Sequence, residues 1–410
     1  MSSRWQQYRR AAAPLPAETL VWPFGGRGLD HVGVRGRPVS EPLPRCADDE
    51  ILVRVDALGL CASDAKMVRM GSDYPLFFDR DFAAEPARLG HEAALTVVSV
   101  GEQWRAQFYP GLRLGIQPDV YLNGQRAIFG VNIPGAMTQY LTLGRDVLAS
   151  DHGSCVFPVL SGVSYAEIAL LEPWACVDVA YSATARRLEP KAGGLLWIKG
   201  EPGDDTWYEM SRPLDSGTVV LSDVPASLAA WVHGQPVRVI ECSGPAALAE
   251  LEQLSGGQGA DDIILLNPAE AISVSIALDA LAARGALVLV SDDRLHEPVD
   301  VDISKLHYQH LALLGCTGPD IAEAYGVRRN RSDLRPGGVL WIMGAGGAMG
   351  RMHLQRALQM PDGPRSVIAT NRGHARLQTL IADFAGLAAC SERELVAFSP
   401  AEEPGRLAAE

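Results

Sequence analysis

Four residues whose side chains commonly bind zinc stand in three short motifs of this chain. The motifs are Gly-Leu-Cys-Ala-Ser-Asp, Gly-His-Glu and Glu-Pro. A lone cysteine or histidine is usually an ordinary packed residue. A catalytic zinc, however, takes three protein ligands from Cys, His and carboxylate side chains and keeps one position open. The combination therefore predicts a metal site formed by Cys61, His91, Glu92 and Glu172, in which Glu92 or Glu172 supplies the carboxylate.

Such a site indicates alcohol–carbonyl chemistry. Zinc lowers the pKa of a bound alcohol, so that hydride can be released near neutral pH. Ser63 follows Cys61 closely enough to relay the alcohol proton toward solvent, and Asp64 is suited to hold a histidine ligand. Ser63 and Asp64 are equally compatible with a plain turn. The predicted catalytic residues are Cys61, Ser63, His91, Glu92 and Glu172.

The composition is that of a globular protein with room for two or three domains. The chain has 410 residues, of which 47% are hydrophobic and 21% charged. Its net charge of −13 argues against a general nucleic-acid or anionic-membrane binder. Seven cysteines without a Cys-x-x-Cys pair are no disulfide framework. With no apolar leader or membrane-spanning run, these features predict a cytoplasmic protein.

The first part of the chain is predicted to be a β domain followed by helices. Residues 1–20 are expected to form a poorly ordered or loosely docked arm. From about 21 to 150, short alternating apolar runs are broken by glycine and proline, which favours a compact antiparallel domain. Residues 164–188 have helical spacing with one proline, which predicts a helix, a break beside Glu172 and a second helix.

From residue 194 the pattern changes to alternating strands and helices. Buried apolar strands joined through helices predict a parallel sheet with covered faces. A helix is expected over 271–285. The expected strands are 194–200, 218–224, 237–244, 261–267, 285–293 and 310–318.

The sequence at the start of this unit recurs, with changes, near the end of the chain. Lys-Ala-Gly-Gly-Leu-Leu-Trp-Ile-Lys-Gly at 191–200 matches Arg-Pro-Gly-Gly-Val-Leu-Trp-Ile-Met-Gly at 335–344. The match predicts a second, partial copy of a nucleotide-binding unit. Half a sheet leaves an exposed edge, which would either pack on the first copy or pair across a dimer. Alternatively, the chain ends before its natural boundary. The expected strands are 337–343, 366–372 and 394–400, and the expected helices 351–360 and 374–386.

The second copy carries the glycine-rich turn expected of a dinucleotide site. Gly-Ala-Gly-Gly-Ala-Met-Gly follows a strand and opens a helix, although a tight turn in a vestigial domain has the same pattern. In the first copy, Glu201 and Asp204 would repel a pyrophosphate, and Asp223 is either a ribose ligand or a capping residue. The predicted cofactor contacts in the turn are Gly344, Gly346, Gly347 and Gly350.

The residues after the next strand bear on the choice of dinucleotide. An acid at this position would accept the ribose 2′-hydroxyl of NAD. Asn371 and Arg372 stand there instead and tolerate or favour a 2′-phosphate, so NADP is slightly favoured over NAD. His374 or Arg376 either assists or only begins a helix.

These motifs resemble those of the zinc-dependent medium-chain alcohol and polyol dehydrogenases, closest to the sorbitol-dehydrogenase-like branch, which includes sugar-phosphate reductases. The resemblance covers most of 45–320 and implies a GroES-like β domain followed by a Rossmann-type parallel sheet. The fold class is therefore α/β plus β. The expected domains are a zinc catalytic domain over 1–190, a Rossmann-like domain with a degraded glycine motif over 191–334, and a second, partial Rossmann repeat over 335–410.

Two departures from the family pattern matter. Many members bind a structural zinc through four closely spaced cysteines, but residues 93–154 contain no cysteine, so one catalytic zinc is predicted. Lys66 stands where the family often has a histidine, and it either contacts a cofactor or substrate phosphate or is simply solvated.

The predicted function is a zinc-dependent oxidoreductase that moves hydride between NAD(P) and a polyol, sugar alcohol or sugar-phosphate-type alcohol or ketone. A small-molecule substrate and a homo-oligomer are expected, without nucleic acid or membrane. The alternatives are a zinc-dependent lyase or epimerase on the same scaffold and a non-catalytic nucleotide-binding module.

Overall fold

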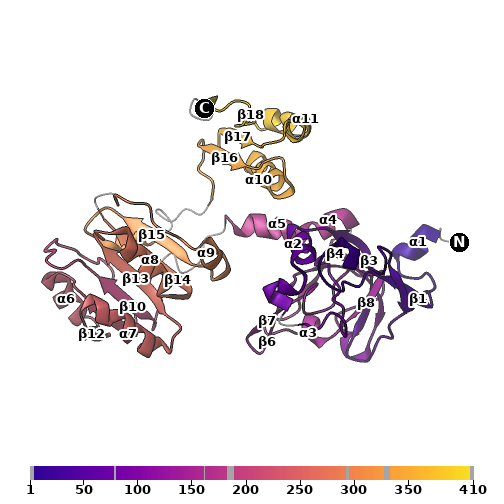
Figure 1. The fold of residues 1–410 in the computed structure, drawn as a ribbon, viewed down its shortest axis with the longest axis horizontal. Coiled ribbons are helices and arrows are strands. Elements are labelled where there is room, and N and C mark those ends of the chain that lie inside the picture. Colours follow the sequence, from indigo (N-terminus) through magenta and orange to yellow (C-terminus); the bar gives the residue numbers. More distant parts are fainter. Residues whose placement is uncertain are drawn as a thin grey trace. The chain divides into compact units, whose positions relative to one another are not determined.

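The computed structural model describes residues 4–77, 80–160, 162–181, 189–291, 295–326 and 333–406. Its larger sheets have five, six and three strands, each from a separate part of the chain (Figure 1). No helix in the described part of the chain has the length and apolar character needed to cross a membrane.

The first part of the chain folds as an antiparallel β domain, which confirms the sequence-based prediction. Its five-stranded sheet has the order β8-β3-β4-β5-β9, and Val53, Leu95 and Leu114 are fully buried in its core. Two small hairpin-like sheets, β1-β2 and β6-β7, accompany it. The strands are β1 (Glu18–Val21), β2 (Val39–Pro42), β3 (Ile51–Gly59), β4 (Glu92–Val100), β5 (Arg113–Ile116), β6 (Asp119–Leu122), β7 (Gln125–Ile128), β8 (Tyr140–Leu143) and β9 (Val156–Pro158).

The helical segment after this domain breaks slightly earlier than its proline suggests. The break lies at Leu170, between α4 and α5, whereas Pro173 sits in the first turn of α5, where a missing N–H costs no hydrogen bond. Residues 182–188 of the expected second helix lie outside the described residues. The helices of this part are α1 (Arg4–Arg9), α2 (Ala62–Met70), α3 (Arg145–Leu148), α4 (Tyr165–Ala169) and α5 (Leu171–Val179).

The expectation of a loosely docked N-terminal arm is wrong. The ring of Tyr8 in α1 lies 3.5 Å from the guanidinium of Arg54, and the Tyr8 carbonyl accepts a hydrogen bond from Arg54 Nη1 at 2.8 Å. The Tyr8 hydroxyl also donates to Asp56 at 3.2 Å. Arg54 and Asp56 form an ion pair of 2.7 Å, with side chains only 5% and 1% exposed. Helix α1 therefore covers a buried ion pair on β3.

The second part forms a six-stranded parallel sheet of the order β12-β11-β10-β13-β14-β15. This is the strand order of a doubly wound dinucleotide-binding fold, which confirms the predicted Rossmann-type sheet. Ile198, Ile264 and Val288 are completely buried in its core. The strands are β10 (Leu195–Lys199), β11 (Thr218–Ser222), β12 (Arg238–Glu241), β13 (Ala260–Leu266), β14 (Leu281–Val290) and β15 (Ala312–Cys316).

The helices of this part are shorter than their apolar patterns suggest. The helix expected over 271–285 ends at Asp279, because β14 begins two residues later. Between β10 and β11 the described chain contains no helix, and residues 200–217 follow an irregular course. The helices are α6 (Ala226–His233), α7 (Gly244–Ser255), α8 (Ala271–Asp279) and α9 (Ile303–Tyr308).

The third part is a three-stranded parallel sheet of the order β16-β17-β18. This matches the order of β10, β11 and β12, as a partial repeat requires. Helix α11 buries Leu377, Leu380 and Phe384 and packs against β18. The domain limits at 190 and 334 stay predictions. The elements are β16 (Val339–Met343), α10 (Ala348–Gln359), β17 (Ser366–Thr370), α11 (His374–Cys390) and β18 (Glu394–Phe398).

We expect replacement of Asp56 by alanine to destabilise the β domain by about 3 kcal/mol, because Arg54 would remain buried without its counter-charge. Hydrogen exchange of peptides from β3 and β4, followed by mass spectrometry, measures this loss. The control is Asp73→Ala, which breaks an ion pair with Arg27 in which both side chains are 69% exposed. Because the pair is solvated, this change should alter stability by less than about 1 kcal/mol. Equal losses in both variants would contradict the prediction.

Candidate functional site

The pairing of two strands brings the predicted zinc ligands together. Strands β3 and β4 are antiparallel, and Gly59 at the end of β3 lies opposite Glu92 at the start of β4. The chain leaves β3 at Gly59 and starts α2 with Cys61 as its N-terminal cap. His91 directly precedes β4. Cys61, His91 and Glu92 therefore meet at one end of the strand pair although they lie thirty residues apart in sequence.

The ligand atoms of these three residues are close enough to share one metal ion. One ligand atom from each of Cys61, His91 and Glu92 lies within 4.8 Å of the other two. His91 and Glu92 are buried and Cys61 is half-buried. Ligand bonds to zinc are about 2.0 to 2.3 Å long, so a small inward shift of the side chains would let one ion reach all three. The donor set of sulfur, nitrogen and oxygen suits zinc, and the described residues contain no second group of this kind.

A glycine makes room for the carboxylate of this cluster. A Cβ atom at position 59 would lie 2.1 Å from Glu92 Oε2 and 2.9 Å from the Glu92 Cβ. Neither distance is possible without displacement of the glutamate. Gly59 is therefore required where Glu92 folds back against the end of β3.

Asp64 and Ser63 face different nitrogen atoms of the His91 ring. Asp64 Oδ2 accepts a hydrogen bond from the Cys61 backbone N–H at 2.9 Å, and its Oδ1 lies 3.6 Å from His91 Nδ1. Both Oδ1 and Nδ1 are buried without a hydrogen-bond partner. Ser63 Oγ lies 3.2 Å from His91 Nε2. A proton on Nδ1 that faces Asp64 would leave the Nε2 lone pair for a metal ion.

The cluster carries an excess of negative charge. Burial lowers the pKa of His91, but a hydrogen bond to Cys61 and the charges of Asp64, Cys61 and Glu172 outweigh burial and raise the pKa to about 9. Burial raises the pKa of Glu92, a hydrogen bond to Cys61 lowers it, and the charge of Glu172 raises it again, with a net increase. The shift of the His91 pKa reflects neighbouring negative groups, which also favour a divalent cation.

Glu172 borders the cluster. It is the second residue of α5, which packs against β4 and β5, and its charge acts on both His91 and Glu92. Its Oε1 accepts a hydrogen bond from Cys176 Sγ at 3.5 Å. The sequence analysis assigned no role to Cys176. Glu172 and Cys176 are four residues apart on one helix, and this spacing is the sequence signal that their side chains are neighbours.

The first Rossmann-like copy fills its own turn with acidic side chains. Glu201 Oε1 pairs with Lys199 Nζ at 3.0 Å and accepts from the Ala269 N–H at 3.5 Å. Asp204 Oδ1 accepts from the Thr206 N–H at 2.9 Å. Since no helix follows β10, no free N–H groups of a helix start face this turn.

The second copy has the local structure that a dinucleotide turn requires. The turn follows β16 with Gly344 at a φ of +72°, a conformation that favours glycine, and leads into the twelve-residue helix α10. A Cβ at Gly350 would lie 2.6 Å from the Gly344 carbonyl oxygen, so this glycine allows the helix to pack closely on the turn. The first turn of α10 contains no acidic residue.

The predicted ribose-side residues lie directly after β17. Asn371 Nδ2 donates to the Gly373 carbonyl at 3.2 Å, and the Arg372 carbonyl accepts from Ser399 Oγ at 3.4 Å, which fixes the backbone of this loop. The Arg372 side chain is exposed. His374 lies 3.5 Å from Glu402, so its ring is already engaged within the protein.

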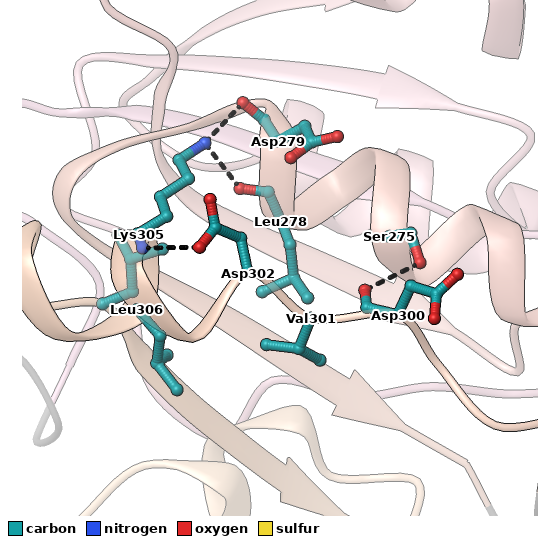
Figure 2. Close-up of a pocket in the computed structure, with 9 residues that line it drawn as sticks. Ser275, Leu278, Asp279, Asp300, Val301, Asp302, Lys305 and Leu306 are labelled. Atoms are coloured by element: carbon teal, nitrogen blue, oxygen red, sulfur yellow. Dashed lines mark hydrogen bonds between the residues drawn. The ribbon is translucent and has the colours of Figure 1, made fainter. Parts of the chain in front are cut away.

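A pocket of about 350 Å³ beside α8 and α9 is a separate feature (Figure 2). Lys305 Nζ donates to the carbonyls of Leu278 and Asp279 at 2.9 and 2.8 Å and so caps the C-terminal end of α8. Asp302 accepts from the Lys305 N–H at 3.1 Å and caps α9. These polar groups serve the helix ends, and none of the predicted site residues lines the pocket.

Comparison with known proteins agrees with the fold and the cluster. Residues 47–151 match the alcohol dehydrogenase GroES-like domain. The chain is 27% identical to L-sorbose 1-phosphate reductase of Klebsiella pneumoniae, over 67% of this chain and 71% of that protein. It is 27% identical to mannitol-1-phosphate 5-dehydrogenase of Aliivibrio fischeri, over 84% and 86%. Sorbitol dehydrogenase of Bacillus subtilis is also 27% identical, over 54% and 62%.

Among solved structures, 2R,3R-butanediol dehydrogenase of Bacillus subtilis aligns with 92% of this chain and 99% of its own. The sequence identity is 14% and the TM-score 0.34.

The fold and the cluster define a zinc-type oxidoreductase with a GroES-like domain and a Rossmann-type sheet. Within that class, the chain resembles the zinc-dependent medium-chain alcohol and polyol dehydrogenases. Zinc and NAD(P) are the cofactors that this resemblance indicates.

We expect Gly59→Ala to weaken zinc binding by about 10- to 100-fold, because the new methyl group displaces the Glu92 carboxylate. Competition with a chromogenic chelator measures the affinity. Gly144→Ala is the matched control, since Gly144 has a φ of −100° and no atom within 4 Å of its added Cβ. Wild-type affinity in Gly59→Ala would show that Glu92 is not a ligand.

We expect zinc affinity to rise at least tenfold per pH unit between about pH 6 and pH 8, and the His91 contribution to level off near pH 9. Zinc binds the neutral imidazole, whereas the pKa of about 9 keeps metal-free His91 protonated at neutral pH. A proton must therefore leave before the ion binds. Chelator competition across this range measures the slope, and a flat profile would contradict the prediction.

Proposed function

We propose that this chain transfers hydride between NAD(P) and a polyol, sugar alcohol or sugar-phosphate-type secondary alcohol or ketone at a single zinc ion. The observation that carries the proposal is the Cys61–His91–Glu92 cluster inside an alcohol dehydrogenase GroES-like domain. The substrate class is supported by relatives whose names are L-sorbose 1-phosphate reductase, mannitol-1-phosphate 5-dehydrogenase and sorbitol dehydrogenase.

In this proposal Cys61, His91 and Glu92 hold the zinc, and Glu172 supplies a further carboxylate at its open side. The ion would act as a Lewis acid on the substrate oxygen and lower the pKa of the alcohol. Asp64 keeps the His91 ring oriented through Nδ1. Ser63 Oγ, 3.2 Å from His91 Nε2, lies beside the ligand atoms and would relay the alcohol proton toward solvent, accepting it while passing on its own hydroxyl proton. The absence of cysteine from residues 93–154 supports one zinc rather than two.

We place the dinucleotide on the second glycine turn, with Gly344, Gly346, Gly347 and Gly350 at the phosphates. Support comes from the strand–turn–helix geometry there and from the self-paired acids in the first copy. Asn371 and Arg372 at the end of β17 supply no carboxylate for a ribose hydroxyl, which favours NADP.

The remaining expectations concern the setting of the enzyme. The net charge of −13 supports a small-molecule substrate without nucleic acid. All seven cysteines are free, which supports a reducing, cytoplasmic compartment. A homo-oligomer is proposed from the family alone. The non-redox alternatives are based on the acidic turn after β10, which lacks a dinucleotide motif. The relatives named as reductases and dehydrogenases favour hydride transfer instead.

We expect Gly346→Asp to abolish dinucleotide binding, because a carboxylate in the turn repels the pyrophosphate. Isothermal calorimetry of NADPH and NADH with the zinc-loaded protein measures the loss, and NADPH should bind the wild-type protein more tightly.

The matched control is Glu201→Gln in the first copy, which removes an acid from the other turn and should leave binding unchanged. Binding that survives Gly346→Asp would return the dinucleotide to the first copy. Complete lack of dinucleotide binding by the wild-type chain would overturn the proposed hydride transfer.

A further inference from the structure

Lys66 is an exposed cation on the helix that carries the metal-site residues. Helix α2 has Cys61 as its cap and Ser63 and Asp64 in its first turn. Lys66 follows Ser63 by three residues, so the two side chains lie on neighbouring parts of the same helix surface. The rise of an α-helix separates their Cα atoms by about 4.5 Å along the axis. The Lys66 backbone therefore lies within one helical turn of Ser63, whose Oγ is 3.2 Å from His91 Nε2.

No described carboxylate pairs with Lys66. The Lys66 ammonium faces the ring of Tyr74, whose centroid lies 5.8 Å from Nζ. At this distance an exposed cation–ring contact contributes little, so the ammonium keeps its capacity for an anion. Arg80, in the segment that follows, is already engaged: it pairs with Glu85 at 3.1 Å and donates to two backbone carbonyls.

The charge balance of the metal centre makes such a cation significant. Cys61, Glu92, Asp64 and Glu172 carry four negative charges when ionised, against two positive charges of a zinc ion. The centre would thus remain negative after it binds zinc and would repel an anionic substrate. A phosphorylated substrate therefore needs a positive group close to the reacting carbon, in addition to the metal ion.

We propose that Lys66 binds the phosphate of a phosphorylated sugar or polyol and selects such substrates over their unphosphorylated counterparts. This inference rests on the proposed function. Lysine provides three N–H donors on a flexible stem and binds phosphate as a point charge. Ser63 at the metal centre and Lys66 one turn away give the substrate two anchoring points, its reacting oxygen and its phosphate.

The test compares L-sorbose 1-phosphate with L-sorbose in the full-length, zinc-loaded enzyme with NADPH. Lys66→Gln should reduce the ratio of the two kcat/KM values, phosphorylated over unphosphorylated, by about 10- to 100-fold. Lys66→Arg should restore much of the ratio because it restores the charge. Arg69→Gln removes a charge one further turn along α2 and should leave the ratio unchanged.

Two kinetic outcomes would overturn the inference. An equal loss with both substrates would show that Lys66 serves catalysis or structure rather than phosphate recognition. A rise in KM for NADPH with an unchanged substrate ratio would assign the lysine to a phosphate of the cofactor.

Calorimetry separates this inference from the proposed function. Binding of L-sorbose 1-phosphate to the zinc-loaded protein without dinucleotide should weaken in Lys66→Gln and should weaken with added salt in the wild type. If this pattern appears and no hydride transfer occurs, the proposed function fails and the role of Lys66 stands. If hydride transfer occurs with equal preference for both sugars, the proposed function stands and the role of Lys66 is overturned.

Discussion

The antiparallel pairing of β3 with β4 is the constraint on which the metal centre depends. Because Gly59 lies opposite Glu92, the residue that follows β3 and the residue that precedes β4 must meet at the same end of the sheet. The pairing also determines which side chain can be large: a Cβ at position 59 would occupy the space of the Glu92 carboxylate. The core beneath, with Val53, Leu95 and Leu114, holds both strands in this register.

The concentration of acidic groups at this position has two physical consequences. Without a cation, it raises the pKa of His91 to about 9, against the effect of burial. The same negative potential that draws in a divalent ion also acts against anionic substrates, because zinc does not neutralise all of the surrounding carboxylates. The positive charge of Lys66, on the solvent side of α2, therefore has more influence on substrate choice than is usual for an exposed lysine.

The sequence allowed the three larger sheets and the proximity of Cys61, His91 and Glu92 to be predicted, but it did not show how the helices end or how the N-terminus docks. Motif residues next to strand ends are local signals, and buried strands have clear apolar patterns. Helix α8 was predicted too long because the apolar run continues into β14 without a polar break. The docking of α1 depends on Arg54 and Asp56 in β3, which read as ordinary polar positions until the fold buries them together with Tyr8.

The two Rossmann-like copies show that a parallel sheet and a phosphate-binding turn obey separate requirements. The first copy retains all six strands, although Glu201 pairs with Lys199 and residues 200–217 contain no helix. The sheet is stabilised by burial of its strands, which the turn does not affect. The second copy has three strands, but its glycines permit both the positive φ at Gly344 and the close approach of Gly350. The turn can thus change without loss of the fold, and a complete sheet is no evidence for a working nucleotide site.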